Sequence, residues 1–239
     1  MTDMIYQSLS QRPEEKDAPP GKDISECYFK EKWGFTVYRT AYGGESERYW
    51  QAIIDDLNAQ VPDSVKELTS GQPEAQTQEI ISLFRLDPQS NEKQMAGLTT
   101  QQMRETFLQA CSNEQETRPM NALRPPMLGS HLFLLVDEEV VAAATSEQND
   151  QLCVKCVDAD YRAEEAVPRN TRVRQTWFGW MMMTTRSLAA FRDHLYLKSE
   201  LQHIAPYMLD ESGLDAVVWD GEDRSVMWEV RRPDRMRQG

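Results

Sequence analysis

Residues 131–139 read HLFLLVDEE, five apolar residues in succession followed by three acids. A half-exposed strand would alternate apolar and polar residues, so a continuous apolar run predicts a strand that is covered on both faces. The runs at 152–157 and 177–183 are also mostly apolar and predict two further strands. The second half of the chain therefore carries a buried sheet.

Another strand is predicted within WGFTVYRTAYGG, residues 33–44. Strand side chains alternate between faces, so Phe35, Val37 and Arg39 share one face and Tyr38 lies on the other. The glycine pair then leads towards a helix, a junction that binds phosphate in some proteins because free N–H groups converge there. Acidic residues directly after the glycines would repel an anion, and no P-loop or GxGxxG pattern is present. We therefore expect a core strand here.

Apolar residues at helical spacing predict helices in the first half of the chain. Ser46 is placed to cap the first helix, and Pro62 is expected to end it. A second helical stretch covers residues 73–84, followed by a polar loop. Thr99 and Gln102 have the spacing of a capping box, which predicts the start of a third helix.

Strands and helices mix without a strict βα alternation, which favours an α+β fold over a doubly wound sheet. We expect a mixed or antiparallel sheet packed against amphipathic helices, and a ferredoxin-like arrangement is one form of it. A helix at 187–197 and a hairpin at 217–230 complete the predicted elements.

A chain of 239 residues fits a single domain. Residues 1–25 are polar, so we expect a flexible N-terminal tail. The predicted α+β domain covers 26–232, and 233–239 form a flexible basic C-terminus.

The formal net charge of −13 opposes attraction to nucleic-acid phosphates and to anionic lipid. No apolar stretch approaches the roughly 18 residues of a membrane span, and the N-terminus lacks the pattern of a secretory signal. We expect a cytoplasmic protein whose four cysteines are thiols. The sequence leaves the oligomeric state open.

Cys153 and Cys156 form a CxxC, a spacing found in redox and zinc sites. The surrounding residues predict a strand, in which positions three apart point to opposite faces. No second pair of ligands completes a zinc site, and no GxSxG marks a serine nucleophile. We therefore expect no metal and no redox cofactor.

Acids follow the strands at 131–136 and 152–157. If these strands are adjacent and parallel, the acids gather at one edge and can bind a divalent cation or hold a substrate ammonium or guanidinium. Solvation of two strand ends is the alternative explanation. Arg39 can pair with these acids or bind a ligand. The candidate catalytic residues are Asp137, Glu138 and His131, with His131 as general base. The candidate substrate-binding residues are Arg39, Tyr38 and Asp158.

Two groups of arginines can form a local anion surface if they fold together. A solvated loop and a frayed tail are the alternative. Such a surface would suit tRNA, which the net charge disfavours. The groups are Arg162, Arg169, Arg172 and Arg174, and Arg231, Arg232, Arg235 and Arg237.

The order WGFTVYRTAYG, LFRLD, GLTTQQMRETF, HLFLLVDEEV, CVKCVDADY and FGWMMM resembles a group of uncharacterised proteins of similar size from ascomycete fungi. The resemblance covers roughly residues 33–185 and lies in apolar patterns, without a catalytic motif. It implies a fungal, cytosolic, single-domain protein.

Three functions stand as hypotheses, and whether the protein is an enzyme stays open among them. The first is a protein of fungal specialised (secondary) metabolism that processes or binds a small-molecule substrate. The second is an arginine-containing cyclodipeptide synthase, which would use aminoacyl-tRNAs and hold an arginyl side chain at the acidic strand ends. The third is a non-catalytic interaction module.

Overall fold

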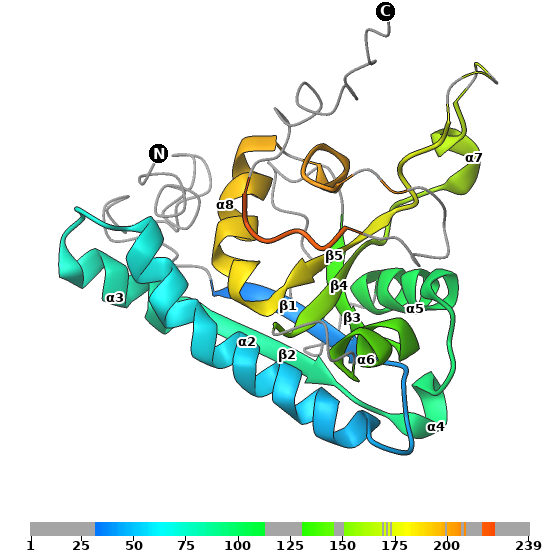
Figure 1. Ribbon diagram of the computed structural model, residues 1–239, viewed down its shortest axis with the longest axis horizontal. Helices are drawn as coiled ribbons and strands as arrows, with labels where there is room; N and C mark the ends of the chain where they lie inside the picture. The colour runs from blue at the N-terminus through cyan, green and yellow to red at the C-terminus, as the bar shows by residue number, and fades with distance from the viewer. Residues whose placement is uncertain are drawn as a thin grey trace, which may run out of the picture.

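The computed structural model describes residues 32–112, 131–145, 151–168, 170, 172, 174–198, 200–206, 208 and 217–222. Within these residues five strands form one sheet (Figure 1). They are β1 (Trp33–Arg39), β2 (Phe84–Gln89), β3 (Leu132–Val136), β4 (Cys153–Asp158) and β5 (Trp180–Thr184). The predicted tails at 1–25 and 233–239 lie outside the described residues.

The strand order is β2-β1-β3-β4-β5. β1 runs parallel to both of its neighbours, whereas β3 pairs with β4 and β4 with β5 in antiparallel fashion. The predicted α+β fold with a mixed sheet is thereby confirmed. The ferredoxin-like arrangement is not found, because such a sheet is antiparallel throughout and here three neighbouring strands are parallel.

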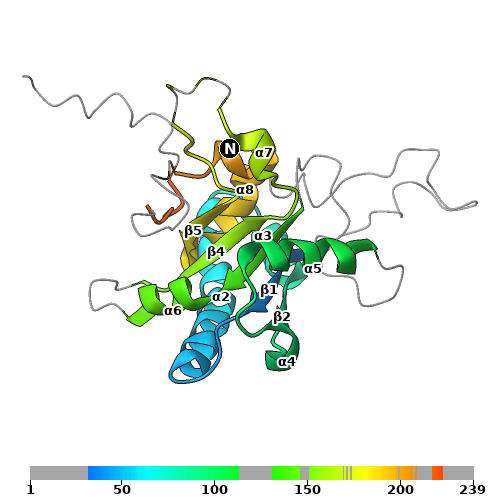
Figure 2. The ribbon, with the colours of Figure 1, turned by 90° about the vertical axis from the view of Figure 1, so that its right-hand side faces the viewer.

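Helices cover both faces of the sheet (Figure 2). On one face α2 packs against α8, and the Phe35 ring of β1 lies 5.8 Å from the Phe191 ring of α8. On the other face Phe107 of α5 stacks on Phe133 of β3, with ring centroids 5.1 Å apart. The helices are α2 (Ser46–Leu68), α3 (Glu74–Leu83), α4 (Glu92–Met95), α5 (Thr100–Ser112), α6 (Glu138–Thr145), α7 (Ala163–Ala166) and α8 (Leu188–Lys198), with single turns η3 (Thr185–Ser187) and η4 (Leu201–His203).

The first helix differs from its prediction at both ends. α2 continues past Pro62 to Leu68, because buried Val61 and Val65 pack on either side of the proline and offset the hydrogen bond that it removes. Ser46 is the first helical residue and not a side-chain cap, since its hydroxyl donates to the Gly43 carbonyl at 2.7 Å.

The capping box at the start of α5 is confirmed. The Thr99 amide donates to the Gln102 side chain at 2.9 Å, and the Gln102 amide donates to the Thr99 hydroxyl at 3.3 Å. These reciprocal bonds satisfy two donors that a helix start leaves open. They fix where α5 begins, and α5 carries the buried Arg104.

β2 was not predicted, because 84–89 reads as the end of a helix and a polar loop. It is the edge strand next to β1, and this position accommodates Pro88 since an outer strand can lose one ladder donor. Gly34 of β1 has a φ of +144°, and a β-carbon there would lie 1.6 Å from the Arg85 carbonyl oxygen. Only glycine therefore allows the two backbones this approach.

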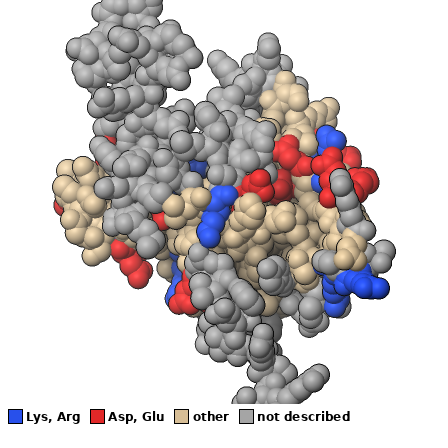
Figure 3. All heavy atoms as spheres, turned by 90° about the horizontal axis from the view of Figure 1, so that it is seen from above, with Lys and Arg blue, Asp and Glu red and all other residues tan. Residues whose placement is uncertain are grey.

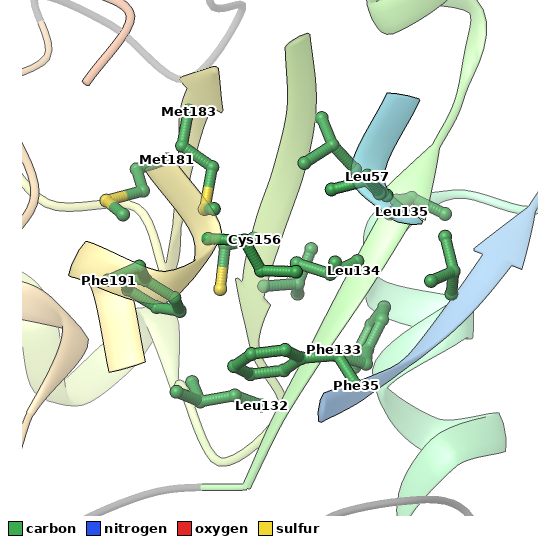
Figure 4. Packing of buried hydrophobic residues seen from close by; sticks show 14 of the residues in the cluster. Phe35, Leu57, Leu132, Phe133, Leu134, Leu135, Cys156, Met181, Met183 and Phe191 are labelled. Carbon is green, nitrogen blue, oxygen red and sulfur yellow. The ribbon is translucent and has the colours of Figure 1, made fainter. Parts of the chain in front are cut away.

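The core extends through the sheet between the two helical layers. Figure 4 shows the Cys156 side chain among apolar groups that include Leu134 and Phe191. Beside β5, Trp219 forms a parallel bridge with Met183, so the first half of the predicted hairpin extends the sheet. Its second half lies outside the described residues.

In the described parts of the chain, no helix combines the length and the apolar character needed to cross a membrane. The longest of them, α2, alternates buried apolar and exposed charged residues. Its buried stripe belongs to the same core cluster as the sheet residues, and the helix packs against α8.

Candidate functional site

The acids that follow β3 and those that follow β4 lie at opposite edges of the sheet, where an edge is the side of the sheet at which the strand ends lie. The two strands are antiparallel, with Leu132 opposite Asp158 and Leu135 opposite Lys155. Asp137 therefore lies at one edge and Asp158 at the other. The condition for a shared acidic site, adjacent and parallel strands, is not met, so the acids after β3 and those after β4 do not converge.

At the first edge, Asp137 and Glu139 hold a buried lysine. The Lys155 side chain is 2% exposed, and its Nζ donates to Asp137 at 2.5 Å and to Glu139 at 2.7 Å. The same ammonium lies 4.2 Å from the centroid of the Trp180 ring, a cation–π distance. Lys155 is thus surrounded by the partners that make its burial tolerable.

Asp137 has a second structural contact, because its other carboxylate oxygen accepts the Val140 amide at 3.1 Å and caps α6. A single acid therefore joins the start of a helix to the middle of β4. Glu138, the next residue, is exposed on the first turn of α6. The catalytic roles proposed for these two acids stay predictions.

Arg39 meets neither Asp137 nor Asp158. Its guanidinium pairs with Glu47, donates to the Ser46 hydroxyl at 3.1 Å and through Nε to the Ala41 carbonyl at 2.8 Å. It also lies 4.5 Å from the Tyr42 ring centroid. The side chain is 3% exposed, so Arg39 joins β1 to the start of α2.

Tyr38 lies on the opposite face of β1, edge-on to Phe107 and Phe133. Burial, with a further contribution from the Asp87 carboxylate, raises the pKa of this phenol well above its usual range. The phenol of Tyr38 therefore stays protonated further into the alkaline range than an exposed tyrosine. The carboxylate of Asp87 itself accepts from Thr36 at 2.9 Å.

At the second edge, His131 forms a pair with Asp160. Its Nδ1 lies 2.9 Å from Oδ2 of Asp160, and the same oxygen accepts the His131 backbone amide at 2.7 Å. The two side chains are 21% and 37% exposed. One carboxylate oxygen thus fixes both the backbone and the ring of His131, which leaves Nε2 as the nitrogen for a ligand.

Asp158 contributes to this edge indirectly. Its Oδ1 accepts the Asp160 amide at 2.9 Å, and the Ala159 amide donates to the His131 carbonyl at 2.8 Å. The turn after β4 is therefore closed on the start of β3. The predicted substrate contact of Asp158 stays a prediction; the observed contact shapes the turn that presents Asp160.

The other two histidines lack such a partner on Nδ1. In His194 this nitrogen is 2.9 Å from the Ala190 carbonyl, and the ring packs edge-on against Trp219. In His203 it is 3.3 Å from the Lys198 carbonyl. Among the described histidines, only His131 has a carboxylate on Nδ1; in His203 the carboxylate of Glu200 lies 3.9 Å from Nε2 instead.

The two cysteines of the CxxC are buried thiols. Cys153 and Cys156 lie on β4, and positions three apart in a strand point to opposite faces. Burial raises the pKa of both thiols, that of Cys156 the more strongly, with a smaller contribution from Asp158. Among the described residues, no group of three or more His, Cys, Asp or Glu is arranged to hold a metal ion.

The proposed basic surface can be followed only in part. Arg162 is exposed and lies 3.6 Å from Glu165, and Arg172 is also exposed. On the face shown in Figure 3, blue and red side chains lie next to one another where the surface is coloured. Arg231 and Arg235 lie outside the described residues.

Comparisons of this chain with protein-family models, with curated proteins and with solved structures found no match. The class that the structure defines is thus a mixed-sheet α+β protein with a carboxylate–histidine pair at one sheet edge. Further identification depends on the chemistry of that pair.

The sequence pointed to His131, whereas Asp160 was not among the candidate residues, although it lies two residues after Asp158. The missing information was the antiparallel pairing of β3 with β4, which brings residue 131 against residues 158–160. Lys155 and Arg104, both buried cations, were also not predicted as parts of the two edges. A charged residue inside an apolar strand was the one available signal for Lys155.

Proposed function

We propose that this protein is an enzyme that processes a small molecule by proton transfer at His131, with Asp160 orienting the ring. The observation that carries the proposal is the 2.9 Å contact between His131 Nδ1 and Asp160 Oδ2. A carboxylate in this position keeps the proton on Nδ1, so the lone pair of Nε2 is free to accept a proton. This is the arrangement of a general base.

The proton would come from an O–H or N–H group of the substrate, or from a water molecule that attacks it. As Nε2 takes the proton the ring becomes an imidazolium, which the Asp160 carboxylate stabilises. The imidazolium then returns the proton to the leaving group. General acid–base catalysis of this kind contributes about 10²- to 10⁴-fold in rate.

The setting we propose is the specialised metabolism of a fungal cell, in the cytoplasm. It is supported by the resemblance in the order of apolar segments over 33–185 and by the low cysteine content. No further support comes from the comparisons.

The synthase hypothesis receives no equivalent support. It requires acids that are available to an arginyl side chain, whereas Asp137 and Glu139 already hold Lys155. Asp158, the other acid invoked, lies at the opposite edge of the sheet. We therefore do not extend the proposal to aminoacyl-tRNA.

The test is untargeted metabolite comparison in a host that lacks the protein, expressing wild type, His131→Gln or Asp160→Asn. We expect a product that appears with the wild type and falls about 100-fold or more with His131→Gln. Asp160→Asn should also reduce it, because an amide no longer stabilises the imidazolium. His203→Gln is the matched control, since His203 is exposed, its Nδ1 faces a backbone carbonyl, and its carboxylate neighbour Glu200 lies at Nε2 and so leaves that nitrogen occupied.

Unchanged product with His131→Gln would exclude His131 as the base. A wild type indistinguishable from the empty host across several growth media would instead favour the non-catalytic interaction module. Circular dichroism of each purified variant separates loss of chemistry from loss of folding.

A further inference from the structure

A buried arginine from another element, α5, donates hydrogen bonds to the backbone next to the turn that carries Asp160. Arg104, on α5, is 5% exposed. Its Nε donates to the Asp158 carbonyl at 2.9 Å, and its Nη2 donates to the Phe178 and Gly179 carbonyls at 3.1 and 3.0 Å. One guanidinium thus joins the end of β4 to the segment before β5.

Tyr161 completes this clamp. Its ring centroid lies 4.8 Å from Cζ of Arg104, and its hydroxyl lies 3.0 Å from the Gln175 amide nitrogen. Tyr161 directly follows Asp160 in the chain, so the position of its ring constrains the backbone from which the carboxylate extends.

Gly179 makes room for that ring. It has a φ of +76°, and a β-carbon there would lie 2.2 Å from Cγ of Tyr161 and 2.5 Å from its Cβ. Contacts under about 3 Å do not occur between carbon atoms at rest, so any side chain at 179 must displace Tyr161. The Gly179 carbonyl also accepts the Asp158 amide at 2.9 Å.

We propose that Arg104, Tyr161 and Gly179 are positioning residues, which hold Asp160 where it can keep the proton of His131 on Nδ1. The inference rests on the proposed function of the His131–Asp160 pair, and it assigns to α5 the task of fixing the orientation of the base. None of the three residues contacts the reacting atoms.

The readout is the tautomer of His131, followed through the ring ¹⁵N chemical shifts at a pH where histidine is neutral. The chain has three histidines, and the signal that disappears in His131→Gln identifies residue 131. In the wild type we expect the Nδ1–H tautomer to dominate. In Gly179→Ala we expect it to become a minority form, because Asp160 shifts with Tyr161.

Gly97→Ala is the matched control. Gly97 has a similar φ of +68°, but a β-carbon there meets nothing within 4 Å. Both variants therefore carry comparable backbone strain, and only the change at 179 displaces an aromatic ring. Gly97→Ala should retain the wild-type tautomer, and its loss of thermal stability should be smaller than that of Gly179→Ala, because only backbone strain is added.

A folded Gly179→Ala protein that keeps the Nδ1–H tautomer would overturn the proposal. If Gly179→Ala does not fold, Tyr161→Leu takes its place, with Tyr161→Phe as the conservative control that retains the ring. The measurement needs no substrate, so it decides the positioning role even if His131→Gln leaves the product unchanged. That second result would remove the proposed function alone.

Discussion

Replacing Asp137 by alanine should destabilise the protein more than removing the lysine that it holds. Asp137→Ala deletes the cap of α6, which is worth about 1 kcal/mol. It also leaves the ammonium of Lys155 with Glu139 alone, whose side chain is 50% exposed. Breaking a buried pair from one side costs about 3–5 kcal/mol when the remaining charge has no partner.

Because Glu139 still accepts from Lys155, we take about 2–3 kcal/mol for that second contribution, below the full range for an unpaired buried charge. The total for Asp137→Ala is then about 3–4 kcal/mol. Lys155→Met retains the apolar stem and lets both carboxylates rehydrate, so its main loss is the cation–π contact with Trp180, about 1–2 kcal/mol. The predicted difference is about 2 kcal/mol.

The assay is urea unfolding followed by tryptophan fluorescence. With a slope of about 2 kcal/mol/M, Asp137→Ala should lower the midpoint by about 1.5–2 M. Glu138→Ala is the control, because it removes an exposed acid from the same helical turn and should change stability by no more than about 0.5 kcal/mol. The double variant at 137 and 155 should be more stable than Asp137→Ala. A larger loss for Lys155→Met than for Asp137→Ala would refute the reasoning.

Tyr38→Phe should flatten the loss of stability at high pH. Burial raises the pKa of Tyr38 in the folded protein, so its contribution to the free energy of unfolding is fully present below the unfolded pKa near 10. Above that pH the contribution falls by up to about 1.4 kcal/mol per pH unit. Equal slopes of unfolding free energy against pH in wild type and variant would contradict this. Iodoacetamide at pH 8 should modify the half-buried Cys111 well before Cys153 and Cys156. Burial raises the pKa of the latter two thiols and keeps them protonated. Peptide mass spectrometry gives the order of modification. Gly34→Ala should lower the thermal midpoint strongly or prevent folding, because its methyl group collides with the backbone of β2; wild-type stability would show that the strands separate without cost.

Much of the fold could be predicted from local patterns. The apolar run at 132–136 is a strand buried on both faces, and the capping box of Thr99 and Gln102 begins α5. β2 could not be predicted, since its outward residues are polar and it contains Pro88. Such a segment becomes a strand only because β1 offers a free edge beside it.

The candidate site likewise has features that the sequence predicts and features that only the tertiary structure sets. The sequence by itself determined that His131 opens a buried strand and that acids follow two strands, because these depend on spacing along the chain. Only the tertiary structure decided which acid meets which base, because hydrogen bonds between Asp160 and His131 require β4 to run antiparallel to β3. Strand direction is set by the connections and by packing of the whole sheet, and no local pattern carries that information.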